Sequence, residues 1–513
     1  MDRRRLPIGV QTFRKLREEN CYYVDKTPYI ERLLAEGTHY FLSRPRRFGK
    51  SLFLDTLKEL FEGSEDLFEG LHIHGGRDWV RHPVVRLDFS GGDYVDPEGL
   101  RRNVTAQLTR IERQEQVATD TTGPERLGFL LEALHRKSGQ RVAVLVDEYD
   151  KPILDALGDP EIADANRRFL RSLYSNVKFA EAHVHFTFLT GVSKFTKVSV
   201  FSDLNNLTDI TLDRRYSAIC GYTEGDLDTV FTPELDGLDR EQVREWYNGY
   251  RWRGTEQVYN PYDVLLLFDS REFKAHWFET GTPAFLMETL LERRVSSVSL
   301  DDMVGTEDLL SAFDVGHIGT EALLFQTGYL TITAEEELGG QALYRLGYPN
   351  REVRQSLNRV LLRRLVKDAG QQTMNSMRLA RLLAAHDCAG LQELFHAFFA
   401  SIPYQWYTNN SIADYEGYYA SVFYSYFAAL GYDIVVEESS SHGRLDMAVR
   451  AGGHVYLFEF KVVELAPPGS ALAQLRERGY ADKYRGRGEP IHLIGVEFSR
   501  KTRNVTAFEV AGG

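Results

Sequence analysis

Hydrophobic positions in the first part of the chain form short apolar runs that alternate with longer amphipathic stretches. Val142–Val146 and Val184–Leu189 are mainly apolar runs of strand length, as in strands that are buried on both faces. Ser51–Phe61 follows the short run Tyr40–Leu42 and repeats its apolar residues at helical spacing. Because such strands alternate with helices, residues 1–215 are predicted to form an α/β domain whose parallel sheet carries helices on both faces.

The pattern changes twice further along the chain. Residues 216–405 are mostly helical in pattern, with short aromatic and glycine-containing interruptions. Residues 406–513 are predicted to form a third region with the order helix, three strands, helix, strand. Its elements are expected at 412–430, 433–436, 445–450, 455–463, 471–485 and 491–498.

Composition excludes several classes of protein. The 513 residues are 43% hydrophobic and 26% charged, which is ordinary globular usage rather than that of a disordered or collagenous chain. No apolar run approaches the ~18 residues that span a bilayer, so no membrane association is expected. The basic N-terminus lacks the apolar stretch of a secretory signal. Three scattered cysteines without a CxxC pair argue against a disulfide framework, and a cytoplasmic location is expected.

The charge distribution bears on nucleic-acid binding. The net charge is 61 − 74 = −13, which argues against non-specific coating of nucleic acid. Local excesses differ from the total: residues 1–50 carry 12 − 6 = +6 and residues 461–513 carry 9 − 6 = +3. A nuclease with local basic patches is therefore compatible with the negative net charge.

A basic loop connects the first strand to the helix that follows. Its sequence is Arg44-Pro45-Arg46-Arg47-Phe48-Gly49-Lys50-Ser51. Backbone N–H groups at such a helix start can cradle phosphates, with Lys50 reaching the β/γ-phosphates and Ser51 ligating Mg²⁺. Arg44 stands where the general P-loop pattern has glycine, so a basic loop before an ordinary helix is the alternative. The candidate nucleotide-binding residues of this loop are Arg46, Arg47, Phe48, Gly49, Lys50 and Ser51.

Two carboxylates at the end of a later strand support the P-loop interpretation. Asp147 and Glu148 follow the run Val142–Val146. At the carboxyl end of a parallel strand, Asp147 can hold the Mg²⁺ shell and Glu148 can polarise the attacking water. Thr190 ends the next strand and is the candidate γ-phosphate sensor; Ser193 is the second option, and a strand-capping hydroxyl is the alternative for both.

A second constellation lies in the C-terminal region. Asp446 falls on one predicted strand, and Glu459 and Lys461 share one face of the next strand because they are two residues apart. Two carboxylates in one cleft can bind Mg²⁺ or Mn²⁺, and Lys461 can position the water or stabilise the transition state. Glu416 on the preceding helix is a further candidate ligand, and Gln474 on the following helix is a candidate catalytic residue. A solvated surface ion pair is the alternative for the Glu-Phe-Lys segment taken alone.

These motifs together resemble a bacterial family in which an AAA-like ATPase domain is fused to a C-terminal PD-(D/E)XK nuclease domain. The resemblance covers nearly the whole chain. The segments that carry it, besides the loop 44–51, are Tyr23-Val24-Asp25-Lys26-Thr27, Val146-Asp147-Glu148-Tyr149-Asp150-Lys151-Pro152, Leu204-Asn205-Asn206-Leu207, Tyr247-Asn248-Gly249-Tyr250, Tyr259-Asn260-Pro261, Gln326-Thr327-Gly328-Tyr329-Leu330 and Pro349-Asn350-Arg351-Glu352-Val353.

The resemblance implies a P-loop NTPase fold for the N-terminal domain and a restriction-endonuclease-like α/β fold for the C-terminal domain. It assigns the nuclease triad to Asp446, Glu459 and Lys461, and it matches Gln474 and Tyr480 to the helix that follows. The proline that names the motif is absent, since Arg444-Leu445 precede Asp446. Cys220-Gly221-Tyr222 departs from the usual Phe-Gly-Phe and is expected to lie outside both sites.

The resulting functional hypothesis is an ATP-hydrolysing protein whose metal-dependent nuclease is gated by the nucleotide state, in defence or mobile-element biology. Its cofactors are ATP and Mg²⁺, with Mn²⁺ as an option at the nuclease site. DNA is favoured over RNA as the substrate, and homo-oligomerisation stays open. The first alternative is an ATP-driven switch whose nuclease fold only binds nucleic acid or a protein. A further alternative is an ATPase without any nuclease role.

Overall fold

The computed structural model divides the chain into two compact units. It describes residues 3–76, 78–194, 206–281, 289–290, 293, 300, 303–311, 319–365, 369–401, 416–440, 443–486, 488–502 and 504–513. The first unit comprises residues 1–286 and 303–350, and the second comprises 287–302 and 351–513. Residues 351–405, which the sequence pattern placed in the middle region, therefore belong to the same unit as the C-terminal region.

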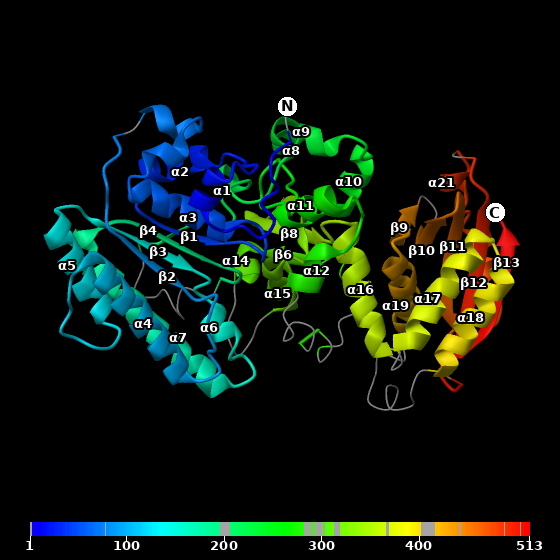
Figure 1. The fold of residues 1–513 in the computed structure, drawn as a ribbon. Coiled ribbons are helices and arrows are strands. Elements are labelled where there is room, and N and C mark those ends of the chain that lie inside the picture. Colours follow the sequence, from blue (N-terminus) through cyan, green and yellow to red (C-terminus); the bar gives the residue numbers. More distant parts are fainter. Residues whose placement is uncertain are drawn as a thin grey trace. The chain divides into compact units, whose positions relative to one another are not determined.

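The first unit is built on a five-stranded parallel sheet with the strand order β2-β3-β4-β1-β5. The strands are β1 (His39–Ser43), β2 (Val84–Asp88), β3 (Val142–Asp147), β4 (Val184–Gly191) and β5 (Thr208–Asp209). Figure 1 shows α1 (Phe13–Glu18), α2 (Thr27–Glu36) and α3 (Lys50–Phe61) on one face and α4 (Pro97–Glu115), α5 (Arg126–Ser138) and α7 (Pro160–Phe179) on the other. The predicted α/β architecture with helices on both faces is confirmed.

The order of the strands sets the distance between the P-loop and Asp147, which lie at the carboxyl ends of two strands. β4 lies between β1, which leads into the P-loop, and β3, which ends in Asp147. Since neighbouring strands are about 4.8 Å apart, the ends of β1 and β3 are separated by about 10 Å. β1 and β3 are buried along their whole length, so the sheet is a rigid base for the loops at this edge.

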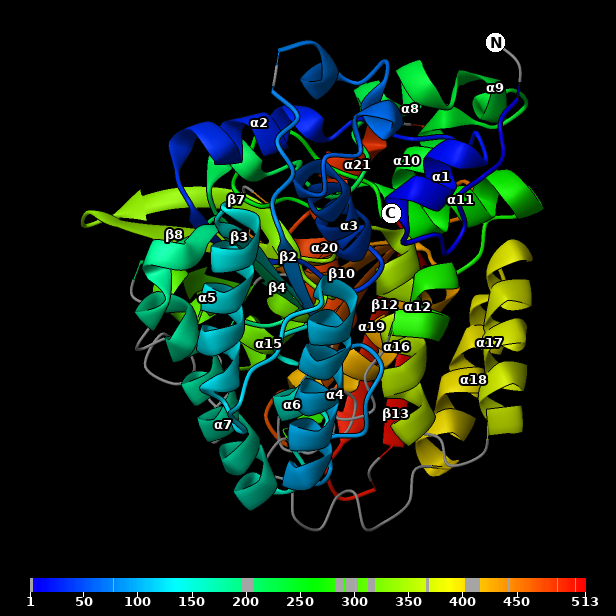
Figure 2. The same ribbon diagram turned by 60° about the vertical axis from the view of Figure 1, so that its left-hand side comes forward.

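The rest of the first unit is mostly helical and also contains a small antiparallel sheet. The helices are α8 (Glu224–Val230), α9 (Thr232–Leu235), α10 (Arg240–Tyr247), α11 (Pro261–Ser270), α12 (His276–Gly281), α14 (Glu307–Ser311) and α15 (Thr320–Thr327). The sheet β6-β8-β7, made of β6 (Met303–Thr306), β7 (Thr331–Leu338) and β8 (Gln341–Gly347), was not predicted (Figure 2). The run of three glutamates in β7 hides the strand pattern, although Gly339-Gly340 is a typical hairpin turn.

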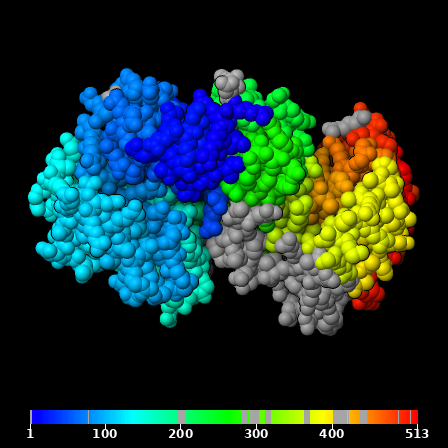
Figure 3. Space-filling model, viewed as in Figure 1, coloured from blue at the N-terminus to red at the C-terminus, as the bar shows by residue number. Residues whose placement is uncertain are grey.

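The N-terminal segment packs against the helices that follow the five-stranded parallel sheet. Tyr22 and Val24 belong to one buried cluster with Phe231, Tyr247 and Leu265. In the space-filling view the dark blue N-terminal residues accordingly lie directly against the green residues of this region (Figure 3). The apolar cluster therefore makes Leu6, Ile8, Tyr22 and Val24 part of the same core as α8, α10 and α11.

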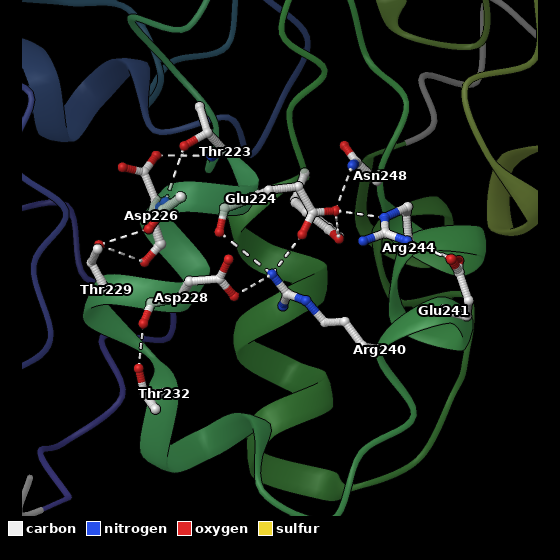
Figure 4. A network of polar contacts seen from close by, with 12 residues as sticks. Thr223, Glu224, Asp226, Asp228, Thr229, Thr232, Arg240, Glu241, Arg244 and Asn248 are labelled. Atoms are coloured by element: carbon white, nitrogen blue, oxygen red, sulfur yellow. Dashed lines mark hydrogen bonds and ion pairs between the residues drawn. The ribbon is translucent and has the colours of Figure 1, made fainter.

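A polar network fixes two of the aromatic motifs to α8 (Figure 4). The Glu224 carboxylate accepts hydrogen bonds from Arg244 at 2.9 Å, from the Asn248 amide at 3.2 Å and from the Tyr259 hydroxyl at 2.6 Å. Arg240 forms an ion pair with the same carboxylate. Asn248 lies in the Tyr-Asn-Gly-Tyr motif and Tyr259 in the Tyr-Asn-Pro motif. The partly buried Glu224 carboxylate therefore holds both motifs in place.

The second unit contains a five-stranded mixed sheet with the order β13-β12-β11-β10-β9. Its strands are β9 (Asp433–Ser440), β10 (Gly443–Ala451), β11 (His454–Val462), β12 (Ile491–Ser499) and β13 (Asn504–Gly512), and its helices are α16 (Arg351–Leu365), α17 (Ala369–Ala384), α18 (Cys388–Ser401), α19 (Glu416–Leu430), α20 (Ser470–Glu477) and α21 (Asp482–Arg485). The predicted α/β fold is confirmed, while the edge strand β13 was missed and the predicted helix 471–485 is two helices. No helix in the described ranges is both long and apolar enough to cross a membrane.

Candidate active sites

The P-loop is closed around its own lysine. Gly49 adopts φ 91° and Arg47 φ 69°, which turns the loop sharply into α3. The Lys50 ammonium donates to the backbone carbonyls of Arg44 and Pro45, both at 2.9 Å. Burial lowers the pKa of Lys50, and the nearby carboxylates Glu148 and Asp147 oppose that shift. The lysine thus lies at the helix start, where it can exchange these carbonyls for phosphate oxygens.

Arg44 explains why this loop lacks the first glycine of the general pattern. Its side chain is buried and donates to the carbonyls of Ser43, Thr211 and Tyr216 at 2.8, 2.9 and 3.1 Å. The guanidinium also lies 4.2 Å from the centre of the Trp252 ring. Burial lowers the pKa of Arg44 to about 10. Arg44 therefore fastens the loop to the chain after β5.

Aromatic residues from the middle of the chain enclose the other side of the P-loop. The buried Phe48 ring packs edge-on against Tyr250, with centroids 4.7 Å apart, and against Trp252 at 5.4 Å. The Trp277 indole donates to the Arg46 carbonyl at 3.0 Å. Phe48, a candidate nucleotide-binding residue, thus offers a ligand only its backbone.

Two carboxylates lie beyond Lys50 at the end of β3. Asp147 is 1% exposed and hydrogen-bonds Ser51, and burial raises its pKa to about 6. Burial also raises the pKa of Glu148, against the effect of Lys50, and Glu148 has a φ of 49°. The structure therefore brings Lys50, Ser51, Asp147 and Glu148 together. A hydroxyl and a carboxylate are donors that suit Mg²⁺, and a buried carboxylate with a raised pKa suits a base.

Asp150 lies two residues after Glu148 and joins the ends of β3 and β4. Its carboxylate accepts from the Ser193 amide and hydroxyl, both at 2.6 Å, and from the Val192 amide at 3.0 Å. Ser193, the second sensor candidate, is thus engaged in holding the end of β4 to the end of β3. Thr190 is fully buried, and its hydroxyl has no hydrogen-bond partner among the described residues.

The two histidines near β4 do not form a shared site. His183 lies in the short 3₁₀ turn before the strand and contacts His135, with 2.9 Å between the two Nδ1 atoms. His185 stacks on His82, with ring centroids 4.1 Å apart. Each ring therefore packs against a different histidine.

A cavity of about 360 Å³ opens above the P-loop. Its wall combines the P-loop residues 46–51, together with Glu148, and three further segments, which are parts of 7–26, 219–222 and 261–265. The expectation that Cys220-Gly221-Tyr222 lies outside both sites is wrong, because these residues line the cavity. Tyr22, Val24 and Leu265 make one part of it apolar, and a phosphate-binding loop beside an apolar pocket fits a nucleoside polyphosphate.

In the second unit, four of the predicted nuclease residues converge. Asp446 on β10 accepts the Phe460 amide of β11 at 2.8 Å. Glu459 on β11 is 1% exposed, and its Oε1 accepts from the Lys461 ammonium at 3.0 Å and from the Gln474 amide. Lys461 also donates to the Phe460 carbonyl at 3.0 Å. The hairpin β10–β11 and helix α20 therefore place two carboxylates, a lysine and an amide at one place.

The donor set fits a hard divalent cation. Carboxylates from adjacent strands and a nearby backbone carbonyl are the oxygen ligands that Mg²⁺ and Mn²⁺ prefer. Within the described residues, no group of three or more His, Cys, Asp or Glu side chains is arranged as a complete metal site. Glu416 is the first residue of α19, and its side chain lies outside the described residues.

Gly495 and Glu497 on β12 position the helix that carries Gln474. Gly495 pairs with Glu459 across the parallel strands, and Glu497 pairs with Lys461. A Cβ atom on Gly495 would lie 2.4 Å from the Leu472 amide nitrogen of α20. The buried Glu497 carboxylate accepts the Ala471 amide at 3.4 Å. This close approach of α20 to β12 is what brings Gln474 to Glu459.

The variant Gly495→Ala is therefore expected to lose most of the nuclease activity that the family resemblance implies for this site. The added methyl group meets backbone atoms of α20, so the helix must move and carry Gln474 away from Glu459. A displacement of about 1 Å at a catalytic group costs roughly 10²-fold in rate. Cleavage rate and melting temperature are measured together on the full chain.

Gly486→Ala is the matched control. Gly486 lies in the same unit with φ −66°, and nothing lies within 4 Å of an added Cβ. This variant should keep the rate and melting temperature of the wild type. Equal rates in Gly495→Ala and the wild type would rule out the assigned role of the β12–α20 contact.

Two family models match the chain, one in each of its terminal regions. Residues 7–201 match the family model described as "Predicted AAA-ATPase", and residues 414–508 match the model of the PD-(D/E)XK nuclease superfamily. The chain belongs to the family in which an AAA-like ATPase domain is joined to a C-terminal PD-(D/E)XK nuclease domain. It is 59% identical over 513 residues, 99% of each chain, to the "Uncharacterized protein in vnfD 5'region" of Azotobacter chroococcum mcd 1.

Proposed function

We propose that this protein hydrolyses ATP at the P-loop and cleaves nucleic acid at the C-terminal site, and that nucleotide binding controls the cleavage. The observation that carries the proposal is the convergence of Asp446, Glu459, Lys461 and Gln474 in a chain whose P-loop is also fully assembled. Two carboxylates can hold a metal that activates water, and a neighbouring lysine can stabilise developing negative charge, so this set of groups suits hydrolysis better than binding alone.

At the first site, different residues would bind different parts of the nucleotide. The loop amides of residues 46–51, the Lys50 ammonium and the α3 dipole bind the phosphates. Ser51 and Asp147 would hold Mg²⁺, and Glu148 accepts a proton from the attacking water. The apolar wall formed by Tyr22, Val24 and Leu265 takes the base.

At the second site, Asp446 and Glu459 would hold Mg²⁺ or Mn²⁺, which lowers the pKa of a bound water and neutralises charge on the phosphate. Lys461 places its ammonium beside the same carboxylate and stabilises the developing negative charge. Gln474 fixes the orientation of the Glu459 carboxylate through its amide. We propose that the substrate is DNA rather than RNA, and that the protein acts in defence or in the biology of mobile elements.

Control by nucleotide is proposed to run through contacts that begin at the P-loop. Phe48 packs on Tyr250. Gly249, which precedes Tyr250, lies so close to Pro349 that a Cβ atom on Gly249 would be 1.8 Å from the Pro349 carbonyl oxygen. Two residues after Pro349, α16 begins. α16 packs on α19, which packs on the strand β11 that carries Glu459 and Lys461. A shift of the loop on nucleotide binding can therefore reach the nuclease sheet through the chain connection between Asn350 and Arg351, where Pro349 follows the loop contacts and α16 leads into the packed elements of the second unit.

The test is a cleavage assay on the full chain with linear DNA, circular DNA and RNA. Mg²⁺ or Mn²⁺ is supplied with and without ATP, and the wild type is compared with Lys50→Met and Glu459→Gln. Cleavage should require Glu459, and its dependence on ATP should disappear in Lys50→Met. Lys50→Met should also fail to retain Mg-ATP, because the substitution removes the cation that neutralises the β/γ-phosphates.

Two results would contradict the proposal in different ways. Equal cleavage with and without ATP, in the wild type and in Lys50→Met, would refute the control by nucleotide and leave the nuclease intact. Nucleic-acid binding without cleavage, unchanged in Glu459→Gln, would favour the ATP-driven switch that only binds.

A further inference from the structure

An arginine on the strand next to β3 lies between two buried carboxylates. Arg86 is on β2, and one guanidinium nitrogen forms an ion pair with Asp55 of α3. Its other terminal nitrogen lies 3.9 Å from the Asp147 carboxylate. Asp55 is 4% exposed and Asp147 1% exposed. Because a buried carboxylate is costly without a positive partner, this one guanidinium serves both.

Asp55 in turn reaches the N-terminal segment. Its second carboxylate oxygen accepts the Phe13 amide at 2.7 Å, at the start of α1. The residues just before and within α1, Val10, Gln11 and Leu16, line the cavity above the P-loop. A chain of polar contacts therefore runs from the start of α1, two residues after the cavity-lining Gln11, through Asp55 and Arg86 to Asp147.

We propose that Arg86 is a positioning residue for the metal of the ATP site, which it serves by holding the Asp147 carboxylate in place. Ser51 and Asp147 are the side chains assigned to the metal. The Glu148 amide donates to one oxygen of the Asp147 carboxylate, and Arg86 lies beside the other oxygen. Fixing a ligand through a neighbouring group of this kind affects metal affinity without touching the nucleotide. The inference rests on the proposed ATP-binding function.

The test separates nucleotide affinity from metal affinity in the full chain. Binding of a fluorescent N-methylanthraniloyl-ATP is measured first in EDTA and then during titration with Mg²⁺. Arg86→Met is expected to bind the metal-free nucleotide as the wild type does, and to need roughly 10–100-fold more Mg²⁺ for the metal-dependent change. Arg86→Lys should recover part of the loss. Arg81→Met, which removes an exposed arginine just before β2, should behave as the wild type.

A purely structural role for Arg86 is distinguished by a second variant. In Arg86→Met, Asp55 is left buried without its partner, and Asp55→Asn in the same chain removes that cost. The double variant should regain melting temperature and keep the weakened Mg²⁺ response. Recovery of the Mg²⁺ response together with stability would overturn the inference, as would an unchanged response in Arg86→Met. Absence of nucleotide binding by the wild type in both conditions would instead refute the ATP site, and the inference with it.

Discussion

The variant Glu459→Gln is expected to lose both divalent-metal binding at the C-terminal site and nucleic-acid cleavage. Glutamine keeps the size of the side chain and removes the charge that a hard cation requires. Loss of the metal's contribution removes about 4 kcal/mol or more from the stabilisation of the transition state, a factor of roughly 10³ in rate. Cleavage is measured by gel assay, and metal binding by Mn²⁺ paramagnetic resonance on the same preparation.

Lys461→Met is the comparison that separates metal binding from stabilisation of the transition state. In the structure the Lys461 ammonium contacts the Glu459 carboxylate and the Phe460 carbonyl, so it occupies the space beside the oxygens that would hold the metal. Methionine removes that cation, so metal binding should persist while cleavage falls. Equal loss of metal binding in Lys461→Met and Glu459→Gln would contradict the separate roles given to the two residues.

The sequence predicted those parts of the fold that depend on local pattern. β1, β3 and β4 are apolar enough to be recognised as buried strands without any knowledge of their neighbours. β7 was not recognised, because its run of three glutamates lies on an exposed ribbon. Edge and ribbon strands owe their structure to pairing with a neighbour, and a single sequence carries little signal for that.

The same distinction holds for the sites. Glu459 and Lys461 are two residues apart on one strand, so their shared face follows from the strand itself. Lys50 with Ser51, and Asp147 with Glu148, are consecutive in the sequence, so their closeness follows from the chain. The destination of the Arg44 side chain depends on Thr211, Tyr216 and Trp252, which lie far away in the chain. Its departure from the glycine pattern was visible in the sequence, while its structural reason was not.

The cavity wall was missed for a related reason. The segments around Cys220 and Tyr262 were noticed as motifs and were given no place in the nucleotide site. Their position in the wall is a consequence of how α8 and α11 pack against the N-terminal segment around Tyr22. One feature of the sequence could have indicated this position. Aromatic and glycine motifs recur in a region without candidate catalytic residues, which indicates that the region packs closely against a site formed by other segments.

Glu148→Gln is expected to separate ATP binding from ATP hydrolysis. Glu148 lines the cavity at the end of β3, and burial raises its pKa, so its carboxylate is placed and tuned to accept a proton from water. Loss of a general base costs typically 10²–10⁴-fold in rate, whereas Lys50, Ser51 and Asp147 remain to bind the nucleotide. Phosphate release and nucleotide affinity are measured side by side.

This variant also decides which step of the ATP cycle controls the nuclease. Glu148→Gln should accumulate in the ATP-bound state, because it binds ATP and does not complete hydrolysis. If binding alone acts through Phe48 and Tyr250 on the chain leading to α16, the variant should cleave nucleic acid in ATP as well as the wild type does. If cleavage falls with hydrolysis, turnover rather than occupancy drives the nuclease. Hydrolysis at the wild-type rate in Glu148→Gln would remove Glu148 from its role as base.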